Sequence, residues 1–215
     1  MNQESSEFKI QEITTVDSPY LAGMKMVLKA LFPKLTPVIE KILDNRFNTE
    51  GQIQKQIFVG ICGESIAGIL QIFYHPWRGG LLSVIDLMGV LESFRSTGLG
   101  LSLMRYAISA TKDIAFQWKV SPKGLLWLTE LDQGNYNSWA ARRVKLYEKT
   151  GAQVRRDIIY QFNGQPETDG EMILWYPISD DVVKIGTKEL AWALWQSGGL
   201  PPEEFTERYG SLNNV

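Results

Sequence analysis

The chain has 215 residues, 44% of them hydrophobic and 11% aromatic, which is enough for a full core in one domain, with or without an appendage. The formal net charge of −2 gives no reason to expect nucleic acid or an anionic membrane surface as a partner. A single cysteine, Cys62, excludes an intramolecular disulfide framework and is typical of a reducing compartment. The first residues lack the features of a signal peptide, and no apolar stretch approaches the ~20 residues of a membrane helix. We therefore expect a soluble cytoplasmic protein.

The first third of the chain predicts a strand, two helices and a hairpin. Residues 8–13 alternate between apolar and polar side chains, as a half-buried strand does. Residues 20–31 carry an apolar stripe at helical spacing, and a second helix is expected over 35–43 after an interrupting proline. Two apolar runs, 53–61 and 64–75, flank a polar turn and predict paired strands.

A buried strand, a glycine-rich turn and a helix follow over residues 82–111. The turn consists of Arg95, Ser96, Thr97, Gly98, Leu99 and Gly100. Backbone N–H groups at the start of a helix have no partners within it, and the helix dipole adds positive charge there. Glycines let an anion approach the backbone, and an arginine can add a charge-assisted contact. The turn therefore predicts a site for a phosphate or pyrophosphate.

The spacing of the turn excludes two commoner phosphate-binding loops. The sequence has no Gly-Lys-Ser or Gly-Lys-Thr here, so the turn is not a P-loop, and Leu103 stands where a dinucleotide fingerprint requires its third glycine.

The second half of the chain predicts further strands and helices. A nearly continuous apolar run at 125–130 is typical of a strand covered on both faces, and the helix between it and 82–90 predicts a right-handed parallel crossover. A polar loop is expected at 121–124, and Gly151 is placed to end a helix over 135–149. The remaining elements are expected to be strands at 154–162 and 171–176, a helix at 187–197 and a polar tail.

Two segments together resemble the GNAT superfamily of acyl-CoA-dependent N-acyltransferases. The first is Arg-x-x-Gly-x-Gly at 95–100, after a strand that ends in Met88, Gly89 and Val90. The second is the run Leu-Tyr-Glu-Lys-Thr-Gly at 146–151, where Ala152 replaces the aromatic residue usual in the family. The resemblance implies an α/β (α+β) fold with a mixed, mostly antiparallel, twisted sheet of six to seven strands flanked by helices. It covers residues 1–178 as one domain, and 179–215 would be a C-terminal helical extension of it.

The resemblance also implies where coenzyme A would bind. The turn from Arg95 to Gly100 would hold its phosphates, and the strand end at Met88, Gly89 and Val90 would pair with the pantetheine. Gly89 could host a bulge that opens the strands, or it could simply end the strand. The family often has an asparagine before the tyrosine of its second segment, and Asn137 is one of the nearest candidates here. No metal is implied.

Three residues are candidates for the catalytic chemistry that the resemblance implies. Tyr147 would protonate the departing thiolate, although a tyrosine on a helix can also be an ordinary core residue. Asp86 alternates with Val84, Met88 and Val90, which would place it in the cleft as the base, and Glu130 is the competing candidate. Either carboxylate could instead be a solvated charge at a strand end. The amide of Val90 would stabilise the oxyanion.

The resemblance leads us to expect acetyl transfer from acetyl-CoA to a primary amine of a small molecule or peptide. A longer acyl-CoA donor is an alternative, and a noncatalytic acyl-CoA-binding regulatory module is another. The expected form is a monomer or homodimer, and neither nucleic acid nor a membrane is an expected partner.

Overall fold

The structure is a computed structural model that describes residues 8–38, 54–130, 139–160, 171–179, 185–197 and 202–209. Its strands are β1 (Phe8–Glu12), β2 (Gln54–Cys62), β3 (Ser65–Trp77), β4 (Gly80–Val90), β5 (Ser121–Glu130), β6 (Gln153–Tyr160) and β7 (Glu171–Pro177). Its α-helices are α1 (Leu21–Leu31), α3 (Leu99–Trp118), α4 (Trp139–Lys149), α5 (Thr187–Ser197) and α6 (Pro202–Tyr209). Two short 3₁₀ helices are η1 (Pro33–Val38) and η2 (Glu92–Phe94).

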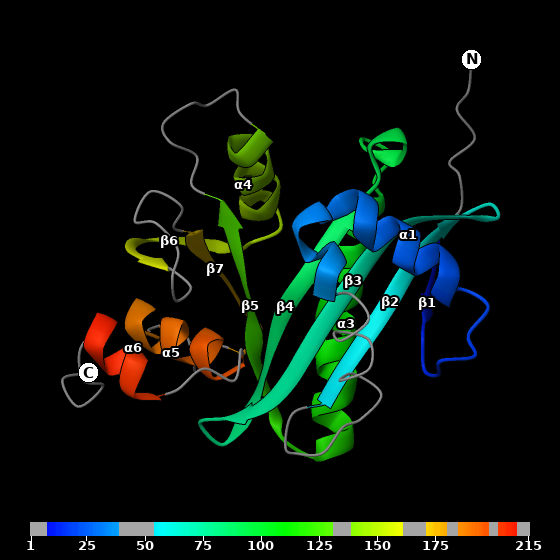
Figure 1. Cartoon of the computed structure of the whole chain (residues 1–215). Helices are drawn as coiled ribbons and strands as arrows, with labels where there is room; N and C mark the ends of the chain where they lie inside the picture. The colour runs from blue at the N-terminus through cyan, green and yellow to red at the C-terminus, as the bar shows by residue number, and fades with distance from the viewer. Residues whose placement is uncertain are drawn as a thin grey trace. The chain divides into compact units, whose positions relative to one another are not determined.

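The strands form a seven-stranded sheet in the order β1-β2-β3-β4-β5-β7-β6 (Figure 1). The pairs β1–β2, β2–β3, β5–β7 and β6–β7 are antiparallel. β3 and β4 form a hairpin whose two turn residues, Arg78 and Gly79, both have positive φ, as a type I′ turn requires. Helix α3 connects the neighbouring strands β4 and β5. The predicted fold class, a mixed and mostly antiparallel sheet flanked by helices, is confirmed.

The chain divides into two compact units. The first unit contains Met1–Tyr74 and Ile85–Ile114, and the second contains His75–Val84 and Ala115–Val215. Among the described helices, none is long and apolar enough to span a membrane.

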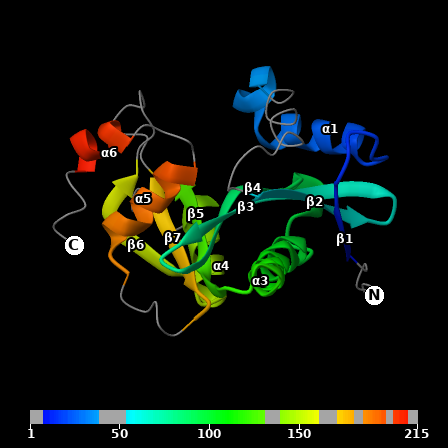
Figure 2. The same ribbon diagram turned by 90° about the horizontal axis from the view of Figure 1, so that it is seen from below.

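In the first unit, α1 and α3 cover opposite faces of β2 and β3 (Figure 2). The face under α1 carries a buried apolar cluster that includes Ile57 and Val59 of β2 and Ile69 of β3. From α1, the residues Met24, Val27 and Leu28 pack into the same cluster. The β2–β3 register pairs Ile57 with Gln71 and Val59 with Ile69, so these four side chains share the face of α1.

Two glycines on the opposite face seat the start of α3. Gly60 of β2 and Gly68 of β3 are cross-strand partners. A Cβ added at Gly60 would lie 2.9 Å from Cδ1 of Leu99, and one added at Gly68 would lie 3.3 Å from Cδ2 of the same leucine. Leu99, the first residue of α3, is 1% exposed. The leucine therefore fills the space that the two missing side chains leave.

In the second unit, the C-terminal helices pack on the strands instead of forming a separate body. Helix α5 contacts β5, β6, β7 and α6. Aromatic rings join these elements: Trp195 of α5 contacts Tyr160 of β6 and both Phe205 and Tyr209 of α6. The predicted polar tail thus includes a helix, α6, whose Phe205 is fully buried.

Several boundaries differ from those predicted. The described part of the expected helix at 35–43 is the 3₁₀ helix η1, which contains Pro37, and residues 39–43 lie outside the described part. β5 begins at Ser121, where a polar loop was predicted. Pairing with β7 explains the longer strand, because Gly124 lies opposite Pro177 and the Lys123 carbonyl accepts a hydrogen bond from the Ile178 amide.

The contact between Leu99 and the glycine pair predicts a non-additive pair of substitutions. Gly60→Ala should overpack the site and Leu99→Ala should leave a cavity, costing about 1–3 and about 2–5 kcal/mol of unfolding free energy. The double variant should lose clearly less than the sum, because the new methyl group occupies part of the cavity. Urea denaturation of the four proteins measures this coupling, and strict additivity would contradict the described packing.

Candidate active site

The predicted anion-binding turn lies between η2 and α3 in the first unit. Ser96 and Gly98 adopt positive φ values of 64° and 96°. Two hydrogen bonds fix the turn: Thr97 Oγ1 donates to the Phe94 carbonyl at 2.7 Å, and the Ser102 amide donates to the Gly98 carbonyl at 3.0 Å. The second bond is the first i to i+4 bond of α3, so Gly98 occupies the N-cap position.

The geometry of this turn suits a phosphate. Residues 95–98 are exposed, and a Cβ added at Gly98 would meet nothing within 4 Å. The amides of Leu99, Gly100 and the next residue have no partner inside the helix, and the dipole of a 20-residue helix adds to them. A non-glycine residue held at positive φ, as Ser96 is, costs free energy and is typical of functional loops.

The strand end at Met88, Gly89 and Val90 adjoins this turn. All three residues are half-buried, and a Cβ on Gly100 would lie 3.8 Å from Cγ2 of Val90. On the other face, a Cβ on Gly89 would lie 2.8 Å from Cδ1 of Leu31, at the end of α1. The absence of a side chain at Gly89 therefore lets the end of α1 approach β4.

Side-chain directions show an irregularity in β4 at Asp86 and Leu87. Leu87 belongs to the apolar cluster under α1. Gln71 shares that face through its pairing with Ile57, and its Nε2 donates to Asp86 Oδ2 at 2.8 Å. Asp86 therefore lies on the same face as Leu87, whereas a regular strand places successive side chains on opposite faces.

The hydrogen bonding of the hairpin is consistent with one extra residue in β4. Trp77 faces Gly80 across the two-residue turn, so a regular ladder would bring Ala67 opposite Val90. Instead the Leu91 amide donates to the Ala67 carbonyl at 2.9 Å. One extra residue in a strand is a β-bulge. We had predicted that Asp86 shares the face of Val90 and that Gly89 could host a bulge. The extra residue lies upstream of Gly89, after Asp86, so Asp86 stays opposite Gln71 on the α1 face while Val90 lies on the other face.

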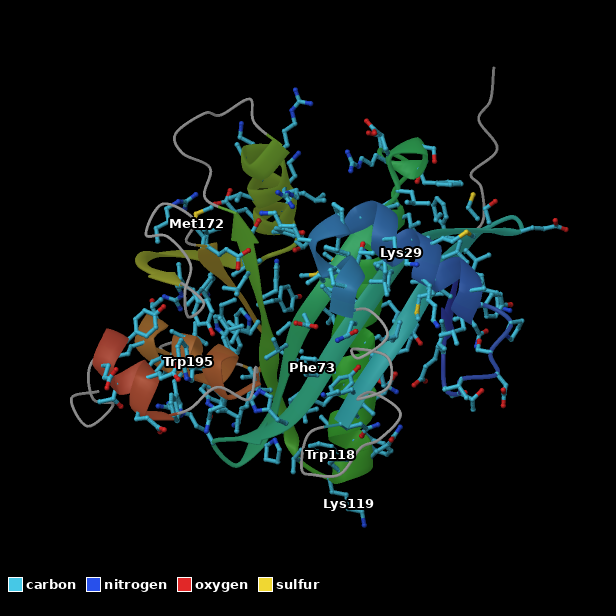
Figure 3. All side chains as sticks on the ribbon, viewed as in Figure 1. Lys29, Phe73, Trp118, Lys119, Met172 and Trp195 are labelled. Atoms are coloured by element: carbon cyan, nitrogen blue, oxygen red, sulfur yellow. The ribbon has the colours of Figure 1, made fainter. Side chains whose placement is uncertain are left out.

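The surroundings of Asp86 raise its pKa towards neutral pH. Its side chain is exposed, and yet the protein around the carboxylate removes enough water to raise the pKa of Asp86 to about 6, while the charge of Lys55 opposes this rise. The ammonium of Lys55 lies 5.0 Å from the ring centroid of Phe73. Phe73 of β3, labelled in Figure 3, is two residues from Gln71 on the same face.

Tyr147 lies in the second unit, in the last turn of α4. Its carbonyl accepts hydrogen bonds from the amides of Thr150 and Ala152, and the Gly151 amide donates to the Glu148 carbonyl. This is the Schellman pattern, with Gly151 at φ 94°, and it confirms the predicted helix end.

The Tyr147 ring packs edge-to-face on Trp127 of β5, with 5.3 Å between centroids. Burial raises the pKa of Tyr147, and the nearby Arg143 lowers it in part.

The side chains of the two remaining predicted residues lie outside the described part of the chain. Glu130 is the last residue of β5, where it pairs with Glu171 of β7, and its side chain lies outside the described part. Asn137 also lies outside the described residues. Among the described residues, no group of three His, Cys, Asp or Glu side chains is placed to hold a metal ion.

Sequence reasoning missed Gln71 and Lys55, the two residues that act on Asp86. Both lie within strands that read as ordinary alternating or apolar runs. A glutamine in the middle of an apolar run, ILQIF at 69–73, was the available signal, because a buried amide requires a polar partner.

Similarity to known proteins is found in the structure of this chain but not in its sequence. No family model matches the sequence, and no curated protein matches it in a sequence search. Many solved structures do match the fold.

Three of these solved structures illustrate the similarity. Naa50 from Arabidopsis thaliana, in complex with the bisubstrate analogue CoA-Ac-MVNAL, has a TM-score of 0.55 at 14% identity and covers 78% of this chain and 97% of its own. A GNAT family acetyltransferase from Elizabethkingia anophelis with acetyl-CoA bound has a TM-score of 0.50 at 19% identity, covering 80% and 98%. Ard1 from Thermoplasma volcanium has a TM-score of 0.52 at 16% identity, covering 80% and 99%.

These likenesses extend over most of the chain and almost the whole of each neighbour. Together with the strand order and the turn that opens α3, they show that this chain has the fold of the GNAT superfamily.

Proposed function

We propose that the protein is an acyl-CoA-dependent N-acyltransferase that transfers an acetyl group from acetyl-CoA to a primary amine. The observation that carries this proposal is the exposed turn from Arg95 to Gly98, which opens α3 beside the strand end at Met88–Val90 on a GNAT fold. The acceptor would be a small molecule or a peptide, and the protein would act in the cytoplasm as a monomer or homodimer.

The turn would hold the coenzyme A part of the acyl donor. Its free amides and the Arg95 guanidinium would bind the pyrophosphate of coenzyme A. The pantetheine would extend along the strand end at Met88, Gly89 and Val90. The Val90 amide would stabilise the oxyanion that forms when the amine attacks, a contribution worth a few kcal/mol.

Asp86 would take the proton from the attacking amine. A pKa of about 6 leaves the carboxylate mostly ionised at pH 7, and yet makes it a stronger base than an ordinary aspartate. The nitrogen forms a bond to the thioester carbonyl carbon, the C–S bond breaks, and the amine proton goes to Asp86. Glu130 remains the alternative base.

Tyr147 would return a proton to the departing thiolate. Its raised pKa keeps the phenol protonated at neutral pH, and its contact with Trp127 fixes the ring orientation. The mechanism needs no metal ion.

The turn can be tested with Gly98→Asp. Wild type should gain roughly 2.7 kcal/mol of stability when coenzyme A or acetyl-CoA is present at about 100 times its dissociation constant. Gly98→Asp should lose this gain, because a carboxylate would occupy the phosphate position. Thermal shift measures the effect, and a series of acyl chain lengths tests whether a longer donor is preferred.

Gly63→Asp is the matched control for that substitution. Gly63 also has a positive φ, 59°, and also has open space at its Cβ position, but it lies in the β2–β3 turn. The Gly63→Asp variant should lose intrinsic stability, as Gly98→Asp does, but it should keep the stabilisation that coenzyme A gives. If no coenzyme A species stabilises wild type, the proposed function is wrong. If a coenzyme A species binds but no amine releases free thiol from the acyl-CoA, the chain is a noncatalytic binding module.

The base can be tested by the pH dependence of turnover. Turnover by wild type should rise with pH through about 6, as Asp86 becomes ionised. Asp86→Asn should lower kcat at pH 7 by about 10²–10⁴-fold and recover part of it at higher pH, where the free amine is more abundant. Glu64→Gln, an exposed charge in the β2–β3 turn, should leave the profile unchanged. An unaltered profile in Asp86→Asn would exclude Asp86 as the base.

The same carboxylate predicts a stability effect that requires no substrate. Its pKa rises from 3.8 to about 6 on folding, so the folded state binds the proton more tightly than the unfolded chain does. The contribution of Asp86 to stability therefore falls as the pH rises from about 4 to about 6. Asp86→Asn should flatten this fall in urea titrations.

The acid can be tested with Tyr147→Phe, which removes only the hydroxyl group. We expect kcat to fall by about 10²-fold or more and coenzyme A affinity to stay within about twofold, because the contact with Trp127 remains. Tyr106→Phe on α3 is the control, since burial raises the pKa of that tyrosine as well. Full turnover in Tyr147→Phe would exclude it as the acid.

A further inference from the structure

We propose that Gln71 is a positioning residue for Asp86: its side-chain amide holds the carboxylate in place at the bulge of β4. This inference rests on the proposed function, in which Asp86 is the base. Gln71 would not touch the acceptor amine. It would act on the reaction by fixing where the carboxylate lies and how readily the carboxylate takes a proton.

The geometry fixes the roles of the two side chains. Gln71 Nε2 donates to Asp86 Oδ2 at 2.8 Å, which is the length of a charge-assisted hydrogen bond. A carboxylate is an acceptor, so the amide must present its nitrogen to Asp86, and its Oε1 must face away. The other carboxylate oxygen, Oδ1, is left to receive the proton of the amine.

The surroundings of Gln71 indicate that this residue does not stabilise the folded state. The residue is 3% exposed, and its Oε1 is buried without a hydrogen-bond partner in the part of the chain that the structure describes. A buried carbonyl oxygen without a partner destabilises the folded state, and an apolar side chain of equal size would avoid that loss. A residue that costs stability and contacts the proposed base is typical of a functional position.

The register of the hairpin brings Gln71 to this aspartate, because with Trp77 facing Gly80 a regular ladder places Gln71 directly opposite Asp86. Without the extra residue, Asp86 and Leu87 could not both lie on the α1 face with Gln71. Of the titratable and charged groups on the described elements around Asp86, Lys55 of β2 is the one whose charge acts on the carboxylate. Lys55 and Gln71 both favour the ionised form, and they oppose the effect of desolvation.

The test compares Gln71→Met with Gln56→Met. Gln56 of β2 is paired with Ile72 and so lies on the opposite face of the sheet, and its Oε1 is also buried without a described partner. Both substitutions replace an amide with an apolar chain of similar length. The first readout is the pKa of Asp86, which is measured by ¹³C NMR of labelled aspartate carboxyl groups. The Asp86→Asn variant assigns the resonance. The measurement requires no substrate.

In Gln71→Met the pKa of Asp86 should rise by about half a unit or more, because the ionised form loses its donor. The melting temperature should stay the same or increase. With an amine that wild type acylates, kcat should fall about tenfold or more, the acid limb of the pH profile should move up with the NMR value, and coenzyme A binding should be unchanged. Gln56→Met should change neither the pKa of Asp86 nor kcat.

An unchanged pKa of Asp86 in Gln71→Met would overturn the inference, and so would wild-type kcat with a wild-type pH profile. Failure of the proposed function looks different. If Asp86→Asn itself keeps full turnover, then Asp86 is not the base, whatever Gln71→Met does. If Asp86→Asn is inactive and Gln71→Met behaves as wild type, only the role of Gln71 is wrong.

Discussion

The packing of one leucine on two glycines determines where the anion-binding turn lies. Leu99 is the first residue of α3 and also the residue that fills the space over Gly60 and Gly68. The free amides of the helix therefore begin at a point fixed by the sheet, within one residue of the buried side chain. A loop joined to the sheet only by its ends would leave those amides free to move. Here the hydrophobic contact pre-organises a polar site, which lowers the entropy lost when a ligand binds.

The bulge in β4 has a comparable effect on the surroundings of the carboxylate. An extra residue after Asp86 interrupts the alternation of the strand, so that Leu87 shares the face of Asp86 instead of lying opposite it. That position accounts for both properties of the side chain, its exposure on one side and the raised pKa that the surrounding protein produces. In both places the local structure departs from regular geometry, and the departures coincide with the residues proposed to bind and react.

The sequence was most informative where function depends on local conformation. The turn from Arg95 to Gly100 and the helix end at Gly151 were predictable, because glycine at positive φ and a helix terminus leave signals within a few residues. The direction of Asp86 was not predictable, because a bulge is decided by pairing with another strand. Gln71 reads as one polar residue in an apolar run, and only the fold shows its partner. Helix α6 was missed because only two of its residues, Phe205 and Tyr209, are aromatic, and charged residues surround them in the sequence.

The ion pair between Arg78 and Glu189 has a consequence for the order in which the chain folds. It joins the turn of the β3–β4 hairpin to α5, and both residues belong to the second unit. A ribosome makes the hairpin turn more than a hundred residues before it makes α5. All segments of the first unit are synthesised by residue 114, so it can acquire its structure early, while the second unit must wait for its last helices. We expect contacts so distant in sequence to make the second unit the slower part to fold.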